Sequence, residues 1–151
     1  MRSADIPLSL YVHWPWCVRK CPYCDFNSHA LTSSCDPSRQ YIDALIHDLM
    51  HSIVYAQNRE LISIFIGGGT PSLIAPHELE RFLETVFSHF KVASDVEITL
   101  EANPGTVDTA HFKAYRSIGI NRLSMGIQSF NDELLKRLGR IHNSEEAHKA
   151  I

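Results

Sequence analysis

The stretch LSLYVHWPWCVRKCPYC, residues 8–24, joins a short β-type run to three closely spaced cysteines. Residues 8–13 are rich in apolar and β-favouring side chains, which predicts a strand. Cys17, Cys21 and Cys24 follow with the spacing C-x3-C-x2-C. Thiolates are ligands for iron–sulfur clusters, zinc and Cu(I). The stretch therefore predicts a metal-binding loop at the end of the first strand.

Segments typical of strands and helices alternate along the rest of the 151-residue chain. Further strands are predicted at residues 61–66, 96–100 and 122–127, where β-branched and other apolar side chains gather. The predicted helix starts are Asp36 as N-cap with Pro37 at the first position, Pro76, Thr106 as a cap, Asn131 as a cap, and Ser144. Gly119 and Gly139 are expected to end the third and fourth helices. This order predicts an α/β fold of about four parallel β/α units.

Four β/α units are too few to close a barrel, and the last predicted helix runs to the end of the sequence. We therefore expect residues 1–151 to be the N-terminal portion of a longer α/β domain, with no second domain present. In parallel β/α arrays the active-site loops lie at the carboxyl ends of the strands. Those ends are expected at His13–Cys17, Gly67–Pro71, Glu101–Pro104 and Gly126–Gln128, where the unusual residues of the chain are found.

The cysteines allow two kinds of metal site. Three thiolates can hold three irons of a [4Fe–4S] cubane and leave the fourth iron open to a small chelating ligand. The alternative is a structural zinc site, which needs a fourth ligand that His13 or His29 could offer. His47 and His51 stand four residues apart on the first predicted helix, a spacing that can bind metal, but we expect both on the surface. Cys35 is expected to be a free thiol that ligates nothing.

The composition argues against several classes of protein. The formal net charge of −3 gives no electrostatic reason to expect a nucleic acid as partner. No run of about 18 apolar residues is present, so no transmembrane segment is predicted. The N-terminus lacks the basic and apolar regions of a secretory signal, and three of the four cysteines are clustered rather than spread as in a disulfide framework. We therefore expect a cytoplasmic protein.

Four motifs stand at the predicted strand ends. They are Y-x-H-x-P-x-C-x3-C-x2-C at residues 11–24, GGGTPS at 67–72, EANPG at 101–105 and GIQSF at 126–130. Together they resemble the coproporphyrinogen III oxidase-like branch of the radical S-adenosylmethionine (SAM) proteins, from about Leu8 to the last residue. The resemblance implies the N-terminal part of a radical SAM partial (β/α) barrel. It also implies a [4Fe–4S] cluster on the three cysteines and a bound SAM that is cleaved reductively.

The resemblance further implies cofactor-binding roles for eight residues, which are Tyr11, Tyr23, Gly68, Gly69, Thr70, Glu101, Gln128 and Arg140. The glycine loop would receive the SAM ammonium group, Glu101 the ribose hydroxyls, Tyr11 would lie close to SAM, and Tyr23 near the adenine. Gln128 and Arg140 match positions that contact a second SAM in the oxidase members. From the residues alone, the glycine loop is equally a tight turn, and Arg140 is equally a solvated charge at a helix end.

The residue two places after the third cysteine divides this branch. Oxidase members read C-x3-C-x2-C-x-C, whereas Phe26 occupies the last cysteine position here, which argues against coproporphyrinogen oxidation. The segment CDFNSH at residues 24–29 resembles instead the haem chaperones of the branch. We therefore predict a protein that binds haem or a porphyrin, with a respiratory haem protein as acceptor and a separate electron donor. A coproporphyrinogen III oxidase and a zinc-stabilised binding module are the alternatives, so whether the protein is an enzyme stays open.

Overall fold

A computed structural model describes residues 6–32, 36–106 and 109–151 of the chain. Its main sheet contains four strands, β1 (Leu8–Trp14), β4 (Leu61–Gly68), β5 (Val92–Ala102) and β6 (Arg122–Met125). They pair in parallel in the order β1-β4-β5-β6, which is also their order along the chain. The carboxyl ends of all four strands therefore meet at one end of the sheet, as the sequence predicted.

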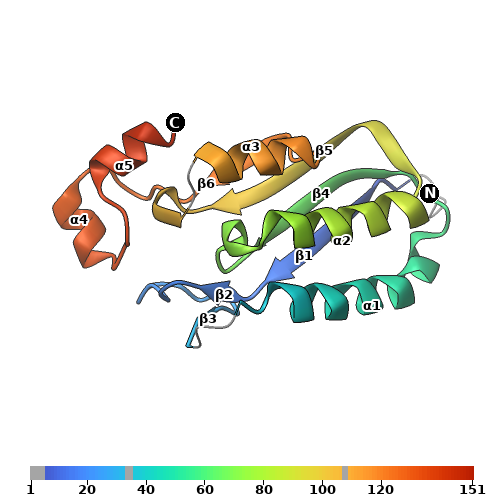
Figure 1. The fold of residues 1–151 in the computed structure, drawn as a ribbon, viewed down its shortest axis with the longest axis horizontal. Helices are drawn as coiled ribbons and strands as arrows, with labels where there is room; N and C mark the ends of the chain where they lie inside the picture. The colour runs from blue at the N-terminus through green and yellow to red at the C-terminus, as the bar shows by residue number, and fades with distance from the viewer. Residues whose placement is uncertain (1–5, 33–35, 107–108) are drawn as a thin grey trace.

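Three helices connect the successive strands and lie along the same side of the sheet (Figure 1). They are α1 (Ser38–Ala56), α2 (Pro76–His89) and α3 (Thr109–Ser117). Two short helices, α4 (Asp132–Arg137) and α5 (Ser144–Lys149), follow β6 beyond the carboxyl end of the sheet. Single 3-10 turns, η2 (Pro71–Leu73) and η3 (Pro104–Thr106), follow β4 and β5. This arrangement confirms the predicted α/β fold of four β/α units.

Alternate strand residues face the helices and form the core. The buried strand side chains of this core cluster are Val12, Trp14, Leu61, Ile64, Ile66, Ile98 and Leu100. The helices contribute Ile42, Leu79, Phe82, Leu83, Val86 and Tyr115 to the same cluster. The hydroxyl of Tyr115 donates to the carbonyls of Ser72 (3.0 Å) and Ile74 (2.7 Å), which satisfies a buried polar group and ties α3 to η2. The buried position of Tyr115 and its two hydrogen bonds thus fix the turn that follows β4.

The opposite face of the sheet carries polar and aromatic side chains. Ser63 Oγ donates to Ser9 Oγ across β1 and β4 (2.7 Å), and Tyr11 stacks on Phe65 with 6.3 Å between ring centroids. Tyr11 is 58% exposed on this face. Because side chains of a strand alternate between faces, this pattern is set by the same register that buries the core. The predicted site residues lie at the carboxyl ends of the strands that carry this polar face.

Two predicted helix caps are wrong. Pro37 rather than Asp36 occupies the N-cap of α1, although Asp36 Oδ1 still accepts the Ser38 amide (2.9 Å). Thr106 is not the cap of the third helix, because it belongs to a separate 3-10 turn, Pro104–Thr106; the third helix is described from Thr109, and residues 107–108 lie outside the described residues. The predicted starts of α2 and α5 and the Asn131 cap of α4 are confirmed. The last helix ends at Lys149, not at the end of the chain.

The strand bounds also differ in detail. β5 begins at Val92, four residues before the prediction, and β6 ends at Met125, two residues before it. A second parallel sheet of β2 (Trp16–Cys17) and β3 (His29–Ala30) was not predicted. Cys35 lies outside the described residues. Within the described ranges, no helix is long and apolar enough to cross a membrane.

Candidate functional site

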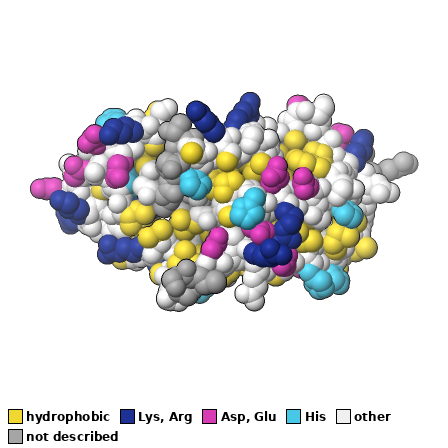
Figure 2. Space-filling view, in the orientation of Figure 1, with side chains coloured by type: hydrophobic (Ala, Val, Ile, Leu, Met, Phe, Trp, Pro, Cys, Tyr) yellow, Lys and Arg dark blue, Asp and Glu magenta, His cyan; other side chains and the backbone are white. Residues whose placement is uncertain are grey.

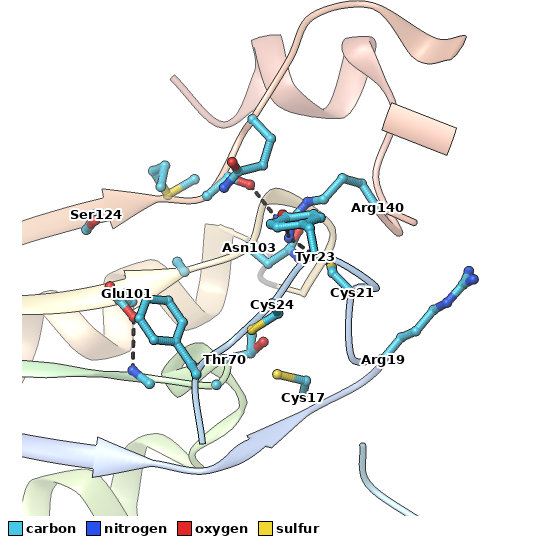
Figure 3. A pocket seen from close by; sticks show the side chains of 17 residues that line it. Cys17, Arg19, Cys21, Tyr23, Cys24, Thr70, Glu101, Asn103, Ser124 and Arg140 are labelled. Carbon is cyan, nitrogen blue, oxygen red and sulfur yellow. Dashed lines mark hydrogen bonds between the residues drawn. The ribbon is translucent and has the colours of Figure 1, made fainter. Parts of the chain in front are cut away.

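The carboxyl ends of the sheet strands and the cysteine loop line one cavity of about 280 Å³ (Figure 3). It draws on four parts of the chain: the cysteine loop, the turn after β4, the end of β5 and the segment after β6. Of the predicted site residues, those lining it are Cys17, Cys21, Tyr23, Cys24, Gly68, Gly69, Thr70, Glu101, Gln128 and Arg140. Only Tyr11 among the predicted residues does not line it. The fold therefore brings together residues that are more than a hundred positions apart in sequence.

The cysteine loop is held in shape by its own backbone and by Lys20. The amide of Cys24 donates to the carbonyl of Cys21 (3.1 Å), and the amide of His29 donates to Pro15 O (2.7 Å). Lys20 Nζ donates to the carbonyls of Phe26 (3.2 Å) and Ser28 (2.9 Å). These bonds close the loop on itself and present its cysteines to the cavity.

The three thiols differ in burial and in their neighbours. Cys17 is buried within β2, whereas Cys21 and Cys24 are partly exposed, and all three are free. Ser28 Oγ lies 3.6 Å from Cys24 Sγ, and Arg140 Nη1 lies 3.5 Å from Cys21 Sγ. Such donors beside sulfur are typical of the surroundings of metal-bound thiolates. The set of three thiols with polar donors therefore fits a metal–thiolate centre.

The three cysteines line the same cavity. Among the described residues, no three side chains of His, Cys, Asp or Glu form a group that could hold one metal ion. A zinc ion needs its ligands within about 2.0–2.3 Å of one centre. A cubane has no such requirement, because each thiolate binds a different iron. The arrangement of the three cysteines around one cavity thus suits a cluster of several irons.

The glycine loop is built for close approach of its backbone to the cysteine loop. Gly68 has φ +114°, and a Cβ on it would lie 2.6 Å from His13 Cε1 and 2.8 Å from the carbonyl oxygen of Trp14. The Gly69 amide donates to Trp14 O (2.6 Å), and the Thr70 amide donates to Trp16 O (2.8 Å). Only glycine combines this dihedral with this contact. The glycines therefore do more than form a turn, since they let two loops of the site touch.

Glu101 lies at the end of β5 with its carboxylate directed into the site (Figure 3). Its Oε2 accepts the Gly68 amide (3.0 Å), and Oε1 has no hydrogen-bond partner among the described residues. Burial raises the pKa of Glu101 above its usual value, although the Gly68 amide and His13 oppose the shift. A partly buried carboxylate with a free oxygen is suited to accept hydrogen bonds from hydroxyl groups of a ligand.

Tyr11 stands beside the cavity rather than in its lining. Its hydroxyl donates to His13 Nδ1 (2.9 Å), because His13 Nε2 donates to the carbonyl of Asn27 (2.9 Å). Burial raises the pKa of Tyr11, and the charge of Glu101 adds to the shift. The sequence did not predict this pair, since its pattern suggests for His13 only the role of a zinc ligand. The Tyr11–His13–Asn27 chain connects the open face of β1 with the cysteine loop.

The segment after β6 closes the cavity from the other side. Gln128 lines it with a backbone φ of +69°, an uncommon value for a residue other than glycine. Arg140 reaches from beyond α4 to Cys21 and to the hydroxyl of Tyr23, with Nη1 3.5 Å from each (Figure 3). Burial raises the pKa of Tyr23, while Arg140 opposes that shift. The interpretation of Arg140 as a solvated helix-end charge is wrong.

Several residues of the cavity were not predicted. Phe26, Asn103, Ser124 and Met125 line it alongside the predicted set. Ser124 is opposite Glu101 in the β5–β6 register. The expectation that site residues lie at the carboxyl ends of the strands, extended from Glu101 to its partner on the next strand, would therefore have found Ser124. Phe26 stands out in the sequence only as a replacement for a cysteine. No sequence signal distinguishes Met125 from an ordinary core methionine.

Comparisons with known proteins agree with this geometry. A sequence model of the radical SAM superfamily matches residues 11–151. The chain is 54% identical to the "Heme chaperone HemW" of Escherichia coli and to that of Haemophilus influenzae, over 95% and 96% of its own length. The structure of coproporphyrinogen III oxidase (HemN) from Escherichia coli superimposes with a TM-score of 0.88 at 31% identity, over 98% of this chain and 34% of that one. The chain spans 38% and 39% of the length of the two chaperones.

Proposed function

This chain belongs to the radical SAM superfamily, and we propose on that basis that Cys17, Cys21 and Cys24 ligate a [4Fe–4S] cluster. Membership of the superfamily implies such a cluster and SAM. A bound cluster supplies the electron for reductive cleavage of SAM. The observation that carries the proposal is that all three thiols line one cavity with the glycine loop and Glu101. The zinc-module alternative is disfavoured by the family to which the chain belongs.

The same cavity is proposed to bind SAM. Gly68, Gly69 and Thr70 would receive its amino-acid end, because their backbone lies against the cysteine loop. Glu101 would accept the ribose hydroxyls through the carboxylate oxygen that no described residue uses. Tyr23 would lie against the adenine, and Tyr11 would border the site from the strand. Gln128 and Arg140 would complete the wall after β6.

We further propose that the whole protein is a haem chaperone of the cytoplasm. Two bacterial relatives that carry this name are 54% identical to the chain. Phe26, which replaces the extra cysteine of the oxidase pattern, is 61% exposed and lines the cavity. An aromatic side chain there cannot replace a thiol as nucleophile or ligand. The proposed partners are haem, a respiratory haem protein that accepts it, and an electron donor.

The cluster proposal is tested on the full-length protein. Anaerobic reconstitution should give about four irons and about four sulfides per chain. Cys17→Ala, Cys21→Ala and Cys24→Ala should each abolish the cluster, whereas Cys35→Ala, outside the described residues, should keep it. The measurements are iron and sulfide content together with the absorbance of the cluster. Stoichiometric zinc in protein from cells supplied with both metals would refute the assignment.

The haem proposal needs a separate test. Full-length protein is titrated with haem and followed by absorbance, and a second sample is incubated anaerobically with reductant, SAM and coproporphyrinogen III. We expect haem binding and no decarboxylated porphyrin by chromatography. Accumulation of the doubly decarboxylated product at enzymatic turnover would establish the oxidase alternative instead. Absence of both haem binding and product would reject both functions while leaving the radical SAM assignment intact.

A further inference from the structure

We propose that Arg140 sets the reduction potential of the cluster by holding its guanidinium against the Cys21 sulfur. The inference rests on the proposed ligation of the cluster by Cys21. It gives Arg140 a role that does not depend on SAM. Arg140 is in this sense a positioning residue, which acts through a cysteine rather than on a substrate.

The approach of Arg140 to the cysteine loop is fixed by its neighbour Gly139. Gly139 has φ +72°, and a Cβ on it would lie 2.9 Å from Pro22 Cδ. The backbone after α4 therefore rests directly on the residue that follows Cys21, which a larger residue at position 139 would prevent. The Arg140 amide donates to Leu135 O (2.9 Å), so the end of α4 also fixes the Arg140 backbone. The contact with Cys21 is thus part of the fold rather than a chance surface encounter.

The guanidinium itself is held at several points. Nη2 donates to the carbonyl of Gly126, and Nη1 lies 3.5 Å from both Cys21 Sγ and the Tyr23 hydroxyl. Nε is buried and makes no hydrogen bond with any described residue. A planar group tied to the end of β6 on one side has little freedom to leave the sulfur on the other. Figure 3 shows Arg140 pointing toward Cys21 and Tyr23.

A cation and N–H donor at this sulfur has a defined electrical effect. Adding an electron makes a cluster more negative, so a fixed positive charge and a hydrogen bond to a ligand sulfur stabilise the reduced form. Both raise the reduction potential. The second arginine of the cavity, Arg19, runs away from the three sulfurs in Figure 3. Glu101, the carboxylate of the cavity, bonds to Gly68 rather than to the cysteine loop.

The test is a redox titration of full-length protein reconstituted anaerobically, in the absence of SAM. The EPR signal of the reduced cluster is followed in the wild type, Arg140→Lys, Arg140→Gln and Arg140→Met. Arg19→Met is the matched control, since it removes an equal charge from the same cavity without a sulfur contact. Iron content is measured first in every sample. Omission of SAM separates the effect on Cys21 from any contact with SAM.

We expect Arg140→Met and Arg140→Gln to move the midpoint potential to more negative values, with Arg140→Lys between them and the wild type. Arg19→Met should produce a smaller shift. If Arg140→Met does not retain iron, the potential of Arg140→Gln decides the question. An iron-loaded Arg140→Gln or Arg140→Met with the wild-type potential would overturn the inference, and so would equal shifts from Arg19→Met and Arg140→Met. A wild type without iron would instead refute the cluster assignment itself.

Discussion

At the scale of single residues, Gly68 combines two constraints that only glycine meets. Its φ of +114° is unfavourable for any residue with a Cβ, and the Cβ would also clash with His13 and with the Trp14 carbonyl. We expect Gly68→Ala to lower the free energy of unfolding by about 2–5 kcal/mol, from backbone strain and overpacking together. The measurement is urea-induced unfolding of the apo protein.

Gly119 provides the matched comparison for Gly68. It has φ +109°, but the nearest atom to a Cβ there is Ile98 Cδ1, at 3.7 Å. Gly119→Ala should therefore show the strain alone, about 1–2 kcal/mol. Equal losses in the two variants would mean that the contact between the glycine loop and the cysteine loop adds nothing to stability.

The ionised side chain of Glu101, which we propose binds the ligand, is expected to lower the free energy of unfolding of the protein without ligand. Its folded-state pKa lies above the usual 4.5, so the ionised carboxylate opposes folding. This loss of stability is absent at a pH below the pKa of Glu101 in the unfolded chain. It is complete at a pH above the pKa of Glu101 in the folded protein. Glu101→Gln should thus raise the melting temperature of apo protein at neutral pH, and the gain should vanish in acid.

The same change should weaken SAM binding by about 1–3 kcal/mol, measured by the EPR response to SAM.

At the scale of elements, the sequence predicts long units better than short ones. The four sheet strands have clear apolar runs and were placed correctly, with errors at their ends. β2 and β3 have two residues each, too few for any periodicity, so their sheet depends on contacts that only the fold creates. The prediction of Thr106 as a helix cap is wrong, because a threonine at that place in the sequence is typical of a cap, whereas the chain makes a 3-10 turn there.

The helix α4 matters because it carries Arg140 to the cysteine loop. It has six residues, so its N-cap should contribute a large part of its stability. Asn131 Oδ1 accepts the amides of Glu133 (2.9 Å) and Leu134 (3.2 Å). Asn131→Ala should cost about 1 kcal/mol, and Asn131→Asp should cost less because it keeps the acceptor. Chemical denaturation of all three proteins checks this, and equal losses in both variants would show that the side-chain bonds are not the cause.

At the scale of the whole molecule, the site is a product of topology. Cys21 and Arg140 meet only because the β/α order brings the cysteine loop and the segment after β6 to the same end of the sheet. The sequence predicted that both segments lie at the carboxyl ends of the strands, but not which of their side chains touch. It could not predict Ser28 beside Cys24, nor the buried His142 that contacts Asn103 (3.0 Å) and Ile127 O (3.0 Å), because these contacts depend on loop conformations without a sequence signature.

Both outer strands of the sheet, β1 and β6, have a neighbour on one side only among the described residues. Side chains of several kinds, apolar ones among them, are spread over the face shown in Figure 2. On β6, Leu123 is 40% exposed. An unpaired strand with an exposed apolar side chain is a template for pairing with another chain. The β6 edge is therefore one place where the 151-residue chain, produced by itself, is expected to self-associate, and the β1 edge with the exposed Tyr11 is the other.

A charge on the β6 edge should suppress the association at that edge. We expect Leu123→Lys to lower the apparent mass of the 151-residue chain in sedimentation velocity, because a lysine on an edge strand opposes strand addition. Leu134→Lys is the control, since Leu134 is similarly exposed (47%) but lies on α4, away from any strand edge. Equal effects of the two lysines would trace the association to exposed apolar area in general. An effect confined to Leu123 assigns it to the open hydrogen-bonding edge of β6.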